Sequence, residues 1–208
     1  MPRLPSNERW LRFVAKPLVF LACLTPFVLL LHGALLGDLG ANPIERVTDV
    51  TGHWGLRLLL ITLAVTPLRR LSGRERLLRF RRMLGLFAFF YVTLHLLTWA
   101  WLDKGLALAP ILNDIAKRPF VTVGFAAWLL LLPLALTSSR GMMHRLGRQW
   151  RRLHRAIYLV AALGVLHYVW LVKADLLGPA IYASVLGALL ALRWAPRVLQ
   201  PDKPINAR

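Results

Sequence analysis

The sequence predicts an all-α membrane protein, a polytopic bundle of six transmembrane helices with both termini in the cytoplasm. Hydrophobic residues make up 57% of the 208 positions, and the mean hydropathy of +0.55 is higher than that of soluble domains. These residues gather in blocks close to the roughly 20 residues that cross a bilayer as a helix. Basic residues gather between alternate blocks, which is the pattern of cytoplasmic loops.

The apolar blocks define the spans in order. The first block follows a basic segment, and because its apolar region is longer than that of a signal peptide, we expect it to be retained. The second block is short and is expected to extend at one end. The predicted spans are residues 17–36, 55–68, 83–102, 120–136, 156–172 and 180–194.

Three regions follow from these spans. Residues 1–16 form a basic cytoplasmic N-terminus, and residues 17–195 form the six-span membrane domain. Residues 196–208 form a polar, proline-containing cytoplasmic tail that we expect to be disordered.

The net charge of +18 is explained by topology. The N-terminal segment, residues 69–82, residues 140–155 and the segment from Arg193 onward together hold 21 of the 27 Lys and Arg residues. In a soluble protein such an excess would suggest nucleic acid, but here it orients the chain and favours contact with anionic lipid. We therefore expect no nucleic-acid partner. The same topology puts an aromatic belt at the outer interface, at Trp99, Trp101, Tyr168 and Trp170.

Two histidines lie away from the ends of apolar spans, where an imidazole is costly and usually functional. His95 is roughly 18 Å above the inner edge of its helix by helical rise, and His167 stands at a similar height on a helix that runs in the same direction. Haem iron with two imidazole ligands needs this arrangement, one imidazole on each face of the porphyrin. The alternative is a pair of buried histidines bonded to carbonyls or to hydroxyls such as those of Thr93 and Thr98. Gly164 leaves room for a flat macrocycle, and Gly85 could do the same.

His154 is a third candidate ligand. It precedes His167 by thirteen residues, which separates the two by roughly 20 Å in height and roughly 140° around the helix. A π-bulge near Gly164 could correct that phase. Arg82 stands at the corresponding position before His95, so a second, inner haem would lack one imidazole. The alternative for His154 is an interfacial histidine beside lipid phosphates.

The remaining histidines and the single cysteine have simpler explanations. His32, His53 and His144 each fit an interfacial position, and we do not expect them to bind iron. Cys23 has no partner for an intrachain disulfide, and no Cys-x-x-Cys-His motif is present, so any haem would be of the b type. No Gly-x-Gly-x-x-Gly motif and no catalytic grouping of serine, cysteine or carboxylates is present, so no catalytic residue is assigned.

Several segments together resemble the MsrQ (YedZ) family, part of the ferric-reductase-like transmembrane family. They are the run around Arg81-Arg82-Met-Leu-Gly85, Thr93-Leu-His95, the run from Leu146 through Trp150 and His154 to Tyr158, and Leu166-His167-Tyr168. Asp49-Val-Thr-Gly52 and Arg118-Pro119-Phe-Val-Thr122-Val-Gly124 also fit.

The resemblance implies a haem-binding subunit of a bacterial inner membrane, with one or two b haems and FMN. It implies that the haem ligands are His95, His154 and His167. It also implies electron transfer from quinones or a cytoplasmic flavin reductase to the periplasmic molybdenum enzyme MsrP, which reduces methionine sulfoxide in oxidised proteins. The wider family has two histidines on each of two helices, and Arg82 departs from that pattern.

Two other functions remain open from the sequence. A stand-alone ferric or oxygen reductase would keep the haem but would usually bring a fused nucleotide-binding domain. A haem-free transporter or scaffold would often show midplane acidic groups, whereas no Asp or Glu falls in the middle of a predicted span.

Overall fold

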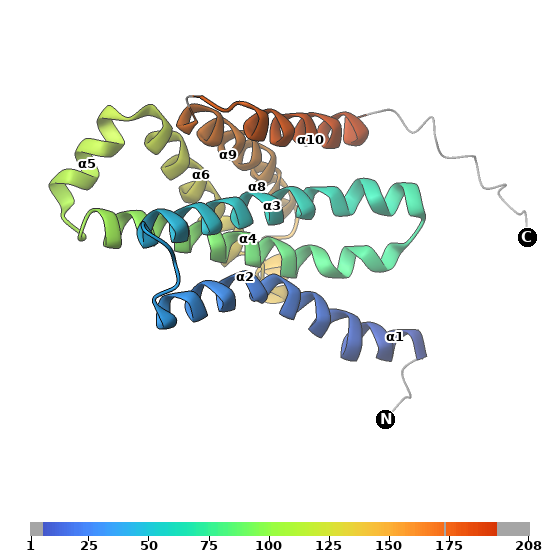
Figure 1. Cartoon of the computed structure of the whole chain (residues 1–208). Coiled ribbons are helices and arrows are strands. Elements are labelled where there is room, and N and C mark those ends of the chain that lie inside the picture. Colours follow the sequence, from blue (N-terminus) through green and yellow to red (C-terminus); the bar gives the residue numbers. More distant parts are fainter. Residues whose placement is uncertain (1–5, 173, 195–208) are drawn as a thin grey trace, which may run out of the picture.

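The computed structural model describes residues 6–172 and 174–194, and the elements found there are helices joined by short turns (Figure 1). The helices are α1 (Ser6–Trp10), η1 (Leu11–Ala15), α2 (Lys16–Leu36), α3 (Pro43–Ser72), η2 (Glu75–Leu77), α4 (Leu78–Leu97), η3 (Thr98–Asp103), α5 (Leu108–Lys117), α6 (Pro119–Leu136), α7 (Arg140–Leu146), α8 (Arg148–Leu153), η4 (His154–Ala156), α9 (Ile157–Leu171) and α10 (Leu177–Trp194).

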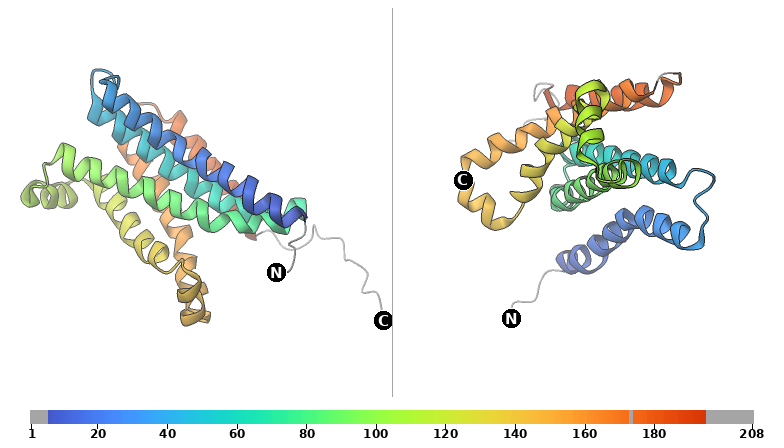
Figure 2. Two further views of the ribbon diagram at one scale, coloured as in Figure 1. Left: turned by 90° about the horizontal axis from the view of Figure 1, so that it is seen from below. Right: turned by 90° about the vertical axis from the view of Figure 1, so that its left-hand side faces the viewer.

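Helix α3 is the centre of the bundle. It packs against α2, α4, α9 and α10, and α6 packs against α4 and α9. Figure 1 shows that α1, the turn between α3 and α4, and the last turn of α10 lie at one end of the bundle. The α5 helix and the turn between α2 and α3 lie at the opposite end, and Figure 2 shows the same arrangement from below.

The core forms where α3 meets α4 and α9. Leu58 and Leu59 of α3 are almost fully buried, and Ala88 of α4 and Ala161 of α9 are completely buried. Small residues at these contacts let the helix backbones approach closely, which favours helix association in membranes because lipid offers no hydrophobic driving force between helices.

Helix α2 is joined to the bundle through the buried side chain of Tyr91. Its hydroxyl donates a hydrogen bond to the carbonyl of Cys23 at 2.7 Å and accepts one from the N–H of Phe27 at 3.1 Å. Pro26, next to Phe27 in α2, has no N–H to donate to the carbonyl of Ala22, so the hydrogen bonds of the helix are weakened at this point. A hydroxyl from a neighbouring helix can satisfy the backbone groups freed near a proline, as membrane helices require.

A membrane helix bundle is therefore confirmed. Within the described residues, five helical stretches are long and apolar enough to cross a bilayer: Glu8–Leu36, Glu75–Asp103, Pro119–Leu136, Arg148–Leu171 and Leu177–Trp194. Helix α3 is not among them because its first half carries polar and charged residues. Because α3 contacts four other helices at the centre of the bundle, less of its surface faces lipid, and fewer of its residues need to be apolar than in the outer helices.

The structure corrects the predicted loops. The segment 37–54, which separates the first two predicted spans, contains the first part of α3, and this helix extends beyond both ends of the predicted second span. The segment 103–119 contains α5, and the basic segment 137–155 contains α7 and α8. The predicted tail, residues 196–208, lies outside the described residues.

Candidate functional site

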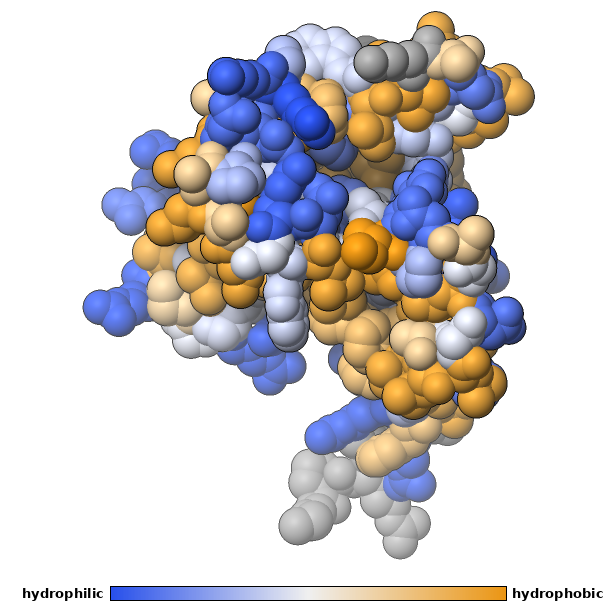
Figure 3. Space-filling view, turned by 60° about the vertical axis from the view of Figure 1, so that its left-hand side comes forward, coloured by the Kyte–Doolittle hydropathy of each residue, from blue (hydrophilic) through white to orange (hydrophobic). Residues whose placement is uncertain are grey.

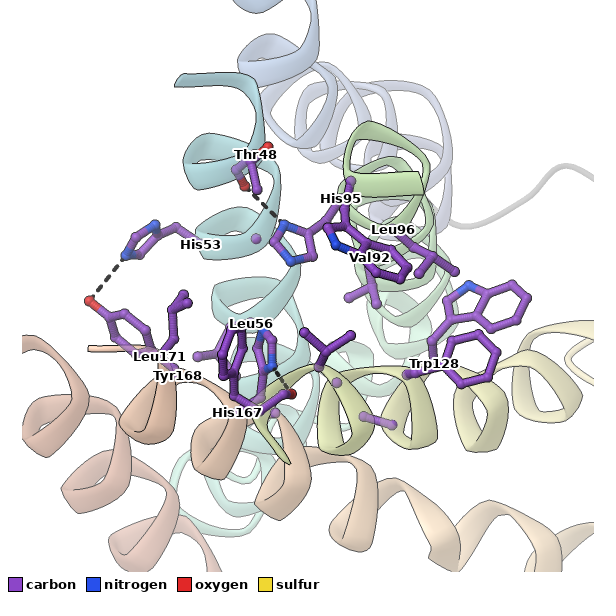
Figure 4. A pocket seen from close by; sticks show the side chains of 18 of the residues that line it. Thr48, His53, Leu56, Val92, His95, Leu96, Trp128, His167, Tyr168 and Leu171 are labelled. Atoms are coloured by element: carbon purple, nitrogen blue, oxygen red, sulfur yellow. Dashed lines mark hydrogen bonds between the residues drawn. The ribbon is translucent and has the colours of Figure 1, made fainter. Parts of the chain in front are cut away.

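A cavity of about 510 Å³ opens between α3, α4, α6 and α9 (Figure 4). His95 enters it from α4 and His167 from α9, so the structure brings these two predicted ligands together. The walls are largely apolar, from Leu56, Leu59, Val92, Leu131 and Val160 among others. Cofactor sites are commonly concave, mostly apolar and roughly 300–1,000 Å³ in size.

The imidazoles of His95 and His167 face each other with ring centres 6.0 Å apart and ring planes at 81°. A metal–imidazole bond is about 2 Å long, and the ring centre lies about 1 Å beyond the nitrogen. Two imidazoles on opposite faces of one iron should therefore have centres roughly 6 Å apart. The separation between the two rings matches that requirement.

Hydrogen bonds to Nδ1 fix the tautomer of both rings. Nδ1 of His95 lies 2.9 Å from the carbonyl oxygen of Thr48, and Nδ1 of His167 lies 2.6 Å from that of Phe120. A carbonyl can only accept, so each Nδ1 carries the proton and each Nε2 keeps its lone pair. Carbonyl bonds of this kind orient the histidine ligands of metals. Among the described residues, Nε2 of neither ring has a hydrogen-bond partner.

Two glycines make room for the rings. A Cβ on Gly52 would lie 2.9 Å from Nδ1 of His95, and a Cβ on Gly124 would lie 2.7 Å from Nδ1 of His167. Gly164 lines the cavity as predicted. Gly85 does not, because it lies against Thr62, away from the cavity.

The residues around the cavity fit a haem. Two oriented imidazoles have free Nε2 atoms and ring centres 6.0 Å apart, and an apolar wall surrounds them. Polar residues from both sides of the opening complete the lining, namely Asp49, Asp103, Arg118 and Asp175. The apolar wall suits the ring of a porphyrin, and Arg118 supplies a cation for one of its two charged propionates.

His53 and Tyr168 also belong to this site. Nε2 of His53 lies 3.2 Å from the hydroxyl of Tyr168, which joins α3 to α9 at the cavity (Figure 4). From the sequence alone, His53 fits an interfacial position and Tyr168 fits the outer aromatic belt. Trp101 and Trp170 of that belt are exposed, whereas Tyr168 and Trp99 line the cavity. The predicted second span begins at residue 55, whereas α3 begins at Pro43 and so carries both Gly52 and His53 on a helix.

His154 lies outside this cavity. Its ring stacks on Trp150 with centres 3.9 Å apart, and its Nδ1 lies 3.1 Å from the carbonyl of Trp150. Its Nε2 is buried and has no hydrogen-bond partner among the described residues. The structure thus separates His154 from the pair His95 and His167. His32 and His144 are exposed, as the sequence analysis expected for interfacial residues.

Comparisons with known proteins agree with this arrangement. The family model for the ferric reductase like transmembrane component matches residues 51–165. A protein-methionine-sulfoxide reductase heme-binding subunit MsrQ from Rhodospirillum rubrum is 56% identical over 183 residues, which cover 86% of this chain and 87% of the relative.

Two further relatives carry the same printed name. The protein from Xanthomonas campestris pv. campestris (strain 8004) is 56% identical over 155 residues, covering 74% of this chain and 71% of the relative. The protein from Herminiimonas arsenicoxydans is 51% identical over 185 residues, covering 86% and 85%. No solved structure matches. From its helix bundle, the facing imidazoles and these identities, the chain belongs to the MsrQ family within the ferric-reductase-like transmembrane proteins.

Proposed function

We propose that the protein is a membrane cytochrome b that binds one b haem between His95 and His167. The observation that carries this proposal is the pair of facing imidazoles with free Nε2 atoms and ring centres 6.0 Å apart. When bound, the haem supplies one-electron transfer, and the protein supplies its orientation and surroundings. The chain's own part is to hold both imidazoles in one tautomer and to keep water away with an apolar wall.

The proposed reaction partner is the periplasmic molybdenum-containing methionine sulfoxide reductase MsrP. The relatives' printed name, heme-binding subunit of protein-methionine-sulfoxide reductase, supports a partner in that system. The proposed cavity lies in the half of the bundle that contains α5, which is the outer half in the predicted topology. Electrons would come from the quinone pool or from a cytoplasmic flavin reductase.

We propose a bacterial inner-membrane location with six spans, namely the five apolar stretches given above and α3. A helix of 30 residues is about 45 Å long, enough to cross a bilayer core of roughly 30 Å. The beginning of α1 and the end of α10 lie at the same end of the bundle, which supports an even number of crossings. Basic residues of α1 and of the turn between α3 and α4, such as Arg9 and Arg74, favour a cytoplasmic position for that end.

A second haem at His154 and a bound FMN are further parts of the proposal. The buried, unpartnered Nε2 of His154 supports ligation there, because buried polar atoms are rarely left without a partner. FMN follows from the family resemblance alone. Haem and flavin content of the purified protein, by pyridine haemochrome assay and by flavin extraction, measures both directly.

The function is tested by reconstitution with the periplasmic reductase. Membranes that contain the reductase and this protein should reduce protein-bound methionine sulfoxide from the native electron donor, and membranes that lack this protein should not. Equal rates in both membranes would contradict the proposal. A stand-alone ferric or oxygen reductase would instead reduce its acceptor at the full rate without any partner.

A further inference from the structure

A second cavity, of about 680 Å³, lies between α2 and α3. We call it the α2–α3 groove and define it by its lining: Ala22, Thr25, Pro26, Leu29, Leu30, His32, Gly33, Asp38, Leu39, Arg46, Asp49, Val50, His53, Trp54 and Arg57. Asp49 and His53 line the candidate haem cavity as well. The groove and the haem cavity therefore lie on two sides of one stretch of α3.

The two walls of the groove differ in chemistry. The α2 wall is mainly apolar, with Pro26, Leu29 and Leu30, while the α3 wall carries Arg46, Asp49, His53 and Arg57. Positions 46, 49, 53 and 57 are spaced three or four residues apart, so they share one face of the helix. An apolar wall opposite a hydrogen-bonding wall suits a flat, amphiphilic ligand whose polar groups lie on its edge.

Of the groove residues, Arg57 carries the charge that costs the most free energy to place within a bilayer. It lies twelve positions before Arg69 on the same helix, roughly 18 Å along the axis and within a bilayer core of about 30 Å. Its Nε donates to the hydroxyl of Tyr182 at 2.9 Å, and its guanidinium lies over Trp54 at 5.3 Å. Its terminal nitrogens have no protein acceptor among the described residues. A charged residue at membrane depth marks a functional site by default.

The acidic residues of the groove argue against a phospholipid headgroup. Neither carboxylate, of Asp38 or of Asp49, forms an ion pair with a described residue. A phosphate binds best where cations stand alone, and carboxylates repel it. Carboxylates and the imidazoles of His32 and His53 are instead proton acceptors, set beside arginine donors.

The groove is open to the membrane from the side. Helix α2 lies at the edge of the bundle (Figure 2), and several of its apolar side chains are exposed, among them Leu29 and Leu21. At the α5 end the surface is a mixture of hydrophilic and hydrophobic residues rather than one apolar face (Figure 3). A membrane-dissolved ligand can thus reach the groove from the lipid, with its polar end directed toward the outer water.

We propose that the α2–α3 groove binds the ring of a membrane-dissolved hydroquinone, an inference that rests on the proposed electron-transfer function. Oxidation of a hydroquinone to a quinone breaks two O–H bonds and releases two protons and two electrons. The carboxylates of Asp38 and Asp49, which form no ion pair with a described residue, receive the protons and return them to water at the outer end. The electrons leave one at a time to an acceptor of the haem class across α3. Arg57 donates hydrogen bonds to a ring oxygen, and Trp54 offers a flat surface.

The first test is photolabelling of the full-length haem-loaded protein in neutral phosphatidylcholine nanodiscs with an azido-ubiquinone. Mass spectrometry should place the label within residues 22–33 or 46–57, and excess decylubiquinone should remove it. Label found elsewhere, or not displaced, would overturn the proposal. Labelling that disappears when phosphatidylglycerol replaces phosphatidylcholine would identify a lipid site and overturn it equally.

The second test uses Arg57→Gln and Arg46→Gln, because both residues line the groove and neither lines the haem cavity. Arg57→Gln should lower labelling and raise the KM for decylubiquinol at least tenfold, with an unchanged haem spectrum and unchanged reduction by dithionite. Lys117→Gln, an exposed change on α5, is the control. If both arginine variants are labelled as strongly as the wild type, the proposed hydroquinone site in the α2–α3 groove is overturned, while the haem proposal stays intact. Absence of haem from the purified wild-type protein would instead contradict the proposed function.

Discussion

His95 and His167 occupy equivalent places in two helix pairs. Each Nδ1 bonds the carbonyl of a residue 47 positions earlier, Thr48 for His95 and Phe120 for His167. Each ring also packs on a glycine one helical turn after that carbonyl, Gly52 or Gly124. The pairs α3–α4 and α6–α9 therefore present their imidazoles in the same way from opposite sides of one cavity. Two ligands supplied by matching supports are suited to the two faces of a planar cofactor.

The first prediction concerns these ligands. His95→Ala and His167→Ala should each lose the haem or convert it from low spin to high spin, because removal of one imidazole opens an axial position. Low-temperature EPR and optical spectra at matched protein level measure the change. His154→Ala should leave this haem intact, since it lies outside the cavity, and should weaken only a second, inner haem.

The exposed His144 provides the control for that series. His144→Ala should match the wild-type spectrum. A full low-spin signal in His95→Ala, together with its loss in His32→Ala or His53→Ala, would contradict the pairing of α4 with α9 and place the haem near α2 and α3.

The second prediction concerns the glycines behind the rings. Gly52→Ala and Gly124→Ala would put a methyl group within 3 Å of an imidazole nitrogen, so each ring must turn or move. We expect lower haem content or altered EPR g-values in both variants. Gly187→Ala is the matched control, because it lies in α10 and a Cβ there meets nothing within 4 Å. Replacing a helical glycine by alanine favours the helix by about 1 kcal/mol, so a loss of haem would not come from a weakened helix. Wild-type spectra in Gly52→Ala would mean that haem binding does not require the His95 ring in its present position.

The sequence predicted His95 and His167 because histidines in apolar spans are rare and their heights could be calculated from helical rise. It could not predict Gly52, Gly124 and His53 as parts of the site. The polar residues from Arg46 to His53 resemble a loop by composition, whereas packing at the centre of the bundle keeps them helical. The glycines were visible only as parts of family segments, because a glycine in a helix carries no sign of which side chain it faces.

The role of Tyr91 could not be predicted from the sequence, because a tyrosine in an apolar span carries no sign of which helix its hydroxyl contacts. The third prediction follows from that contact. Tyr91→Phe removes the hydroxyl that bonds both Cys23 and Phe27, leaving two backbone groups without that partner in an apolar setting. The expected loss of stability is about 2–4 kcal/mol. Thermal unfolding followed by circular dichroism in detergent measures it, and Tyr182→Phe, which removes the bond from exposed Arg57, should cost less.

The fourth prediction concerns the ion pair that holds α5. Nζ of Lys104 lies 2.9 Å from Oδ2 of Asp114, and this hydrogen bond lowers the pKa of Asp114 from its ordinary 3.8. A lowered folded-state pKa means that the pair stabilises α5 above the unfolded pKa of the carboxyl, and that this stabilisation is lost as pH falls through the folded pKa.

Hydrogen exchange of the α5 amides, corrected for intrinsic rates, should therefore be faster in Asp114→Asn than in wild type at pH 7. The difference should shrink once pH falls below the ordinary pKa of 3.8 and vanish only below the lowered pKa of Asp114 in the folded protein, where the wild-type carboxyl is protonated. A difference of the same size at both pH values would mean that the asparagine acts through packing rather than through lost charge.

The fifth prediction concerns topology. A reporter placed after residue 208, or between Arg70 and Arg79, should be cytoplasmic, because basic residues are concentrated in those segments. A reporter between Gly37 and Asn42, in the turn that precedes α3, should be periplasmic if α3 crosses the membrane. Paired alkaline phosphatase and green fluorescent protein fusions at the three positions give opposite signals on the two sides. If the reporter before α3 and the reporter after it are on the same side, α3 does not cross. The shared height of His95 and His167 in the bilayer would then need another explanation.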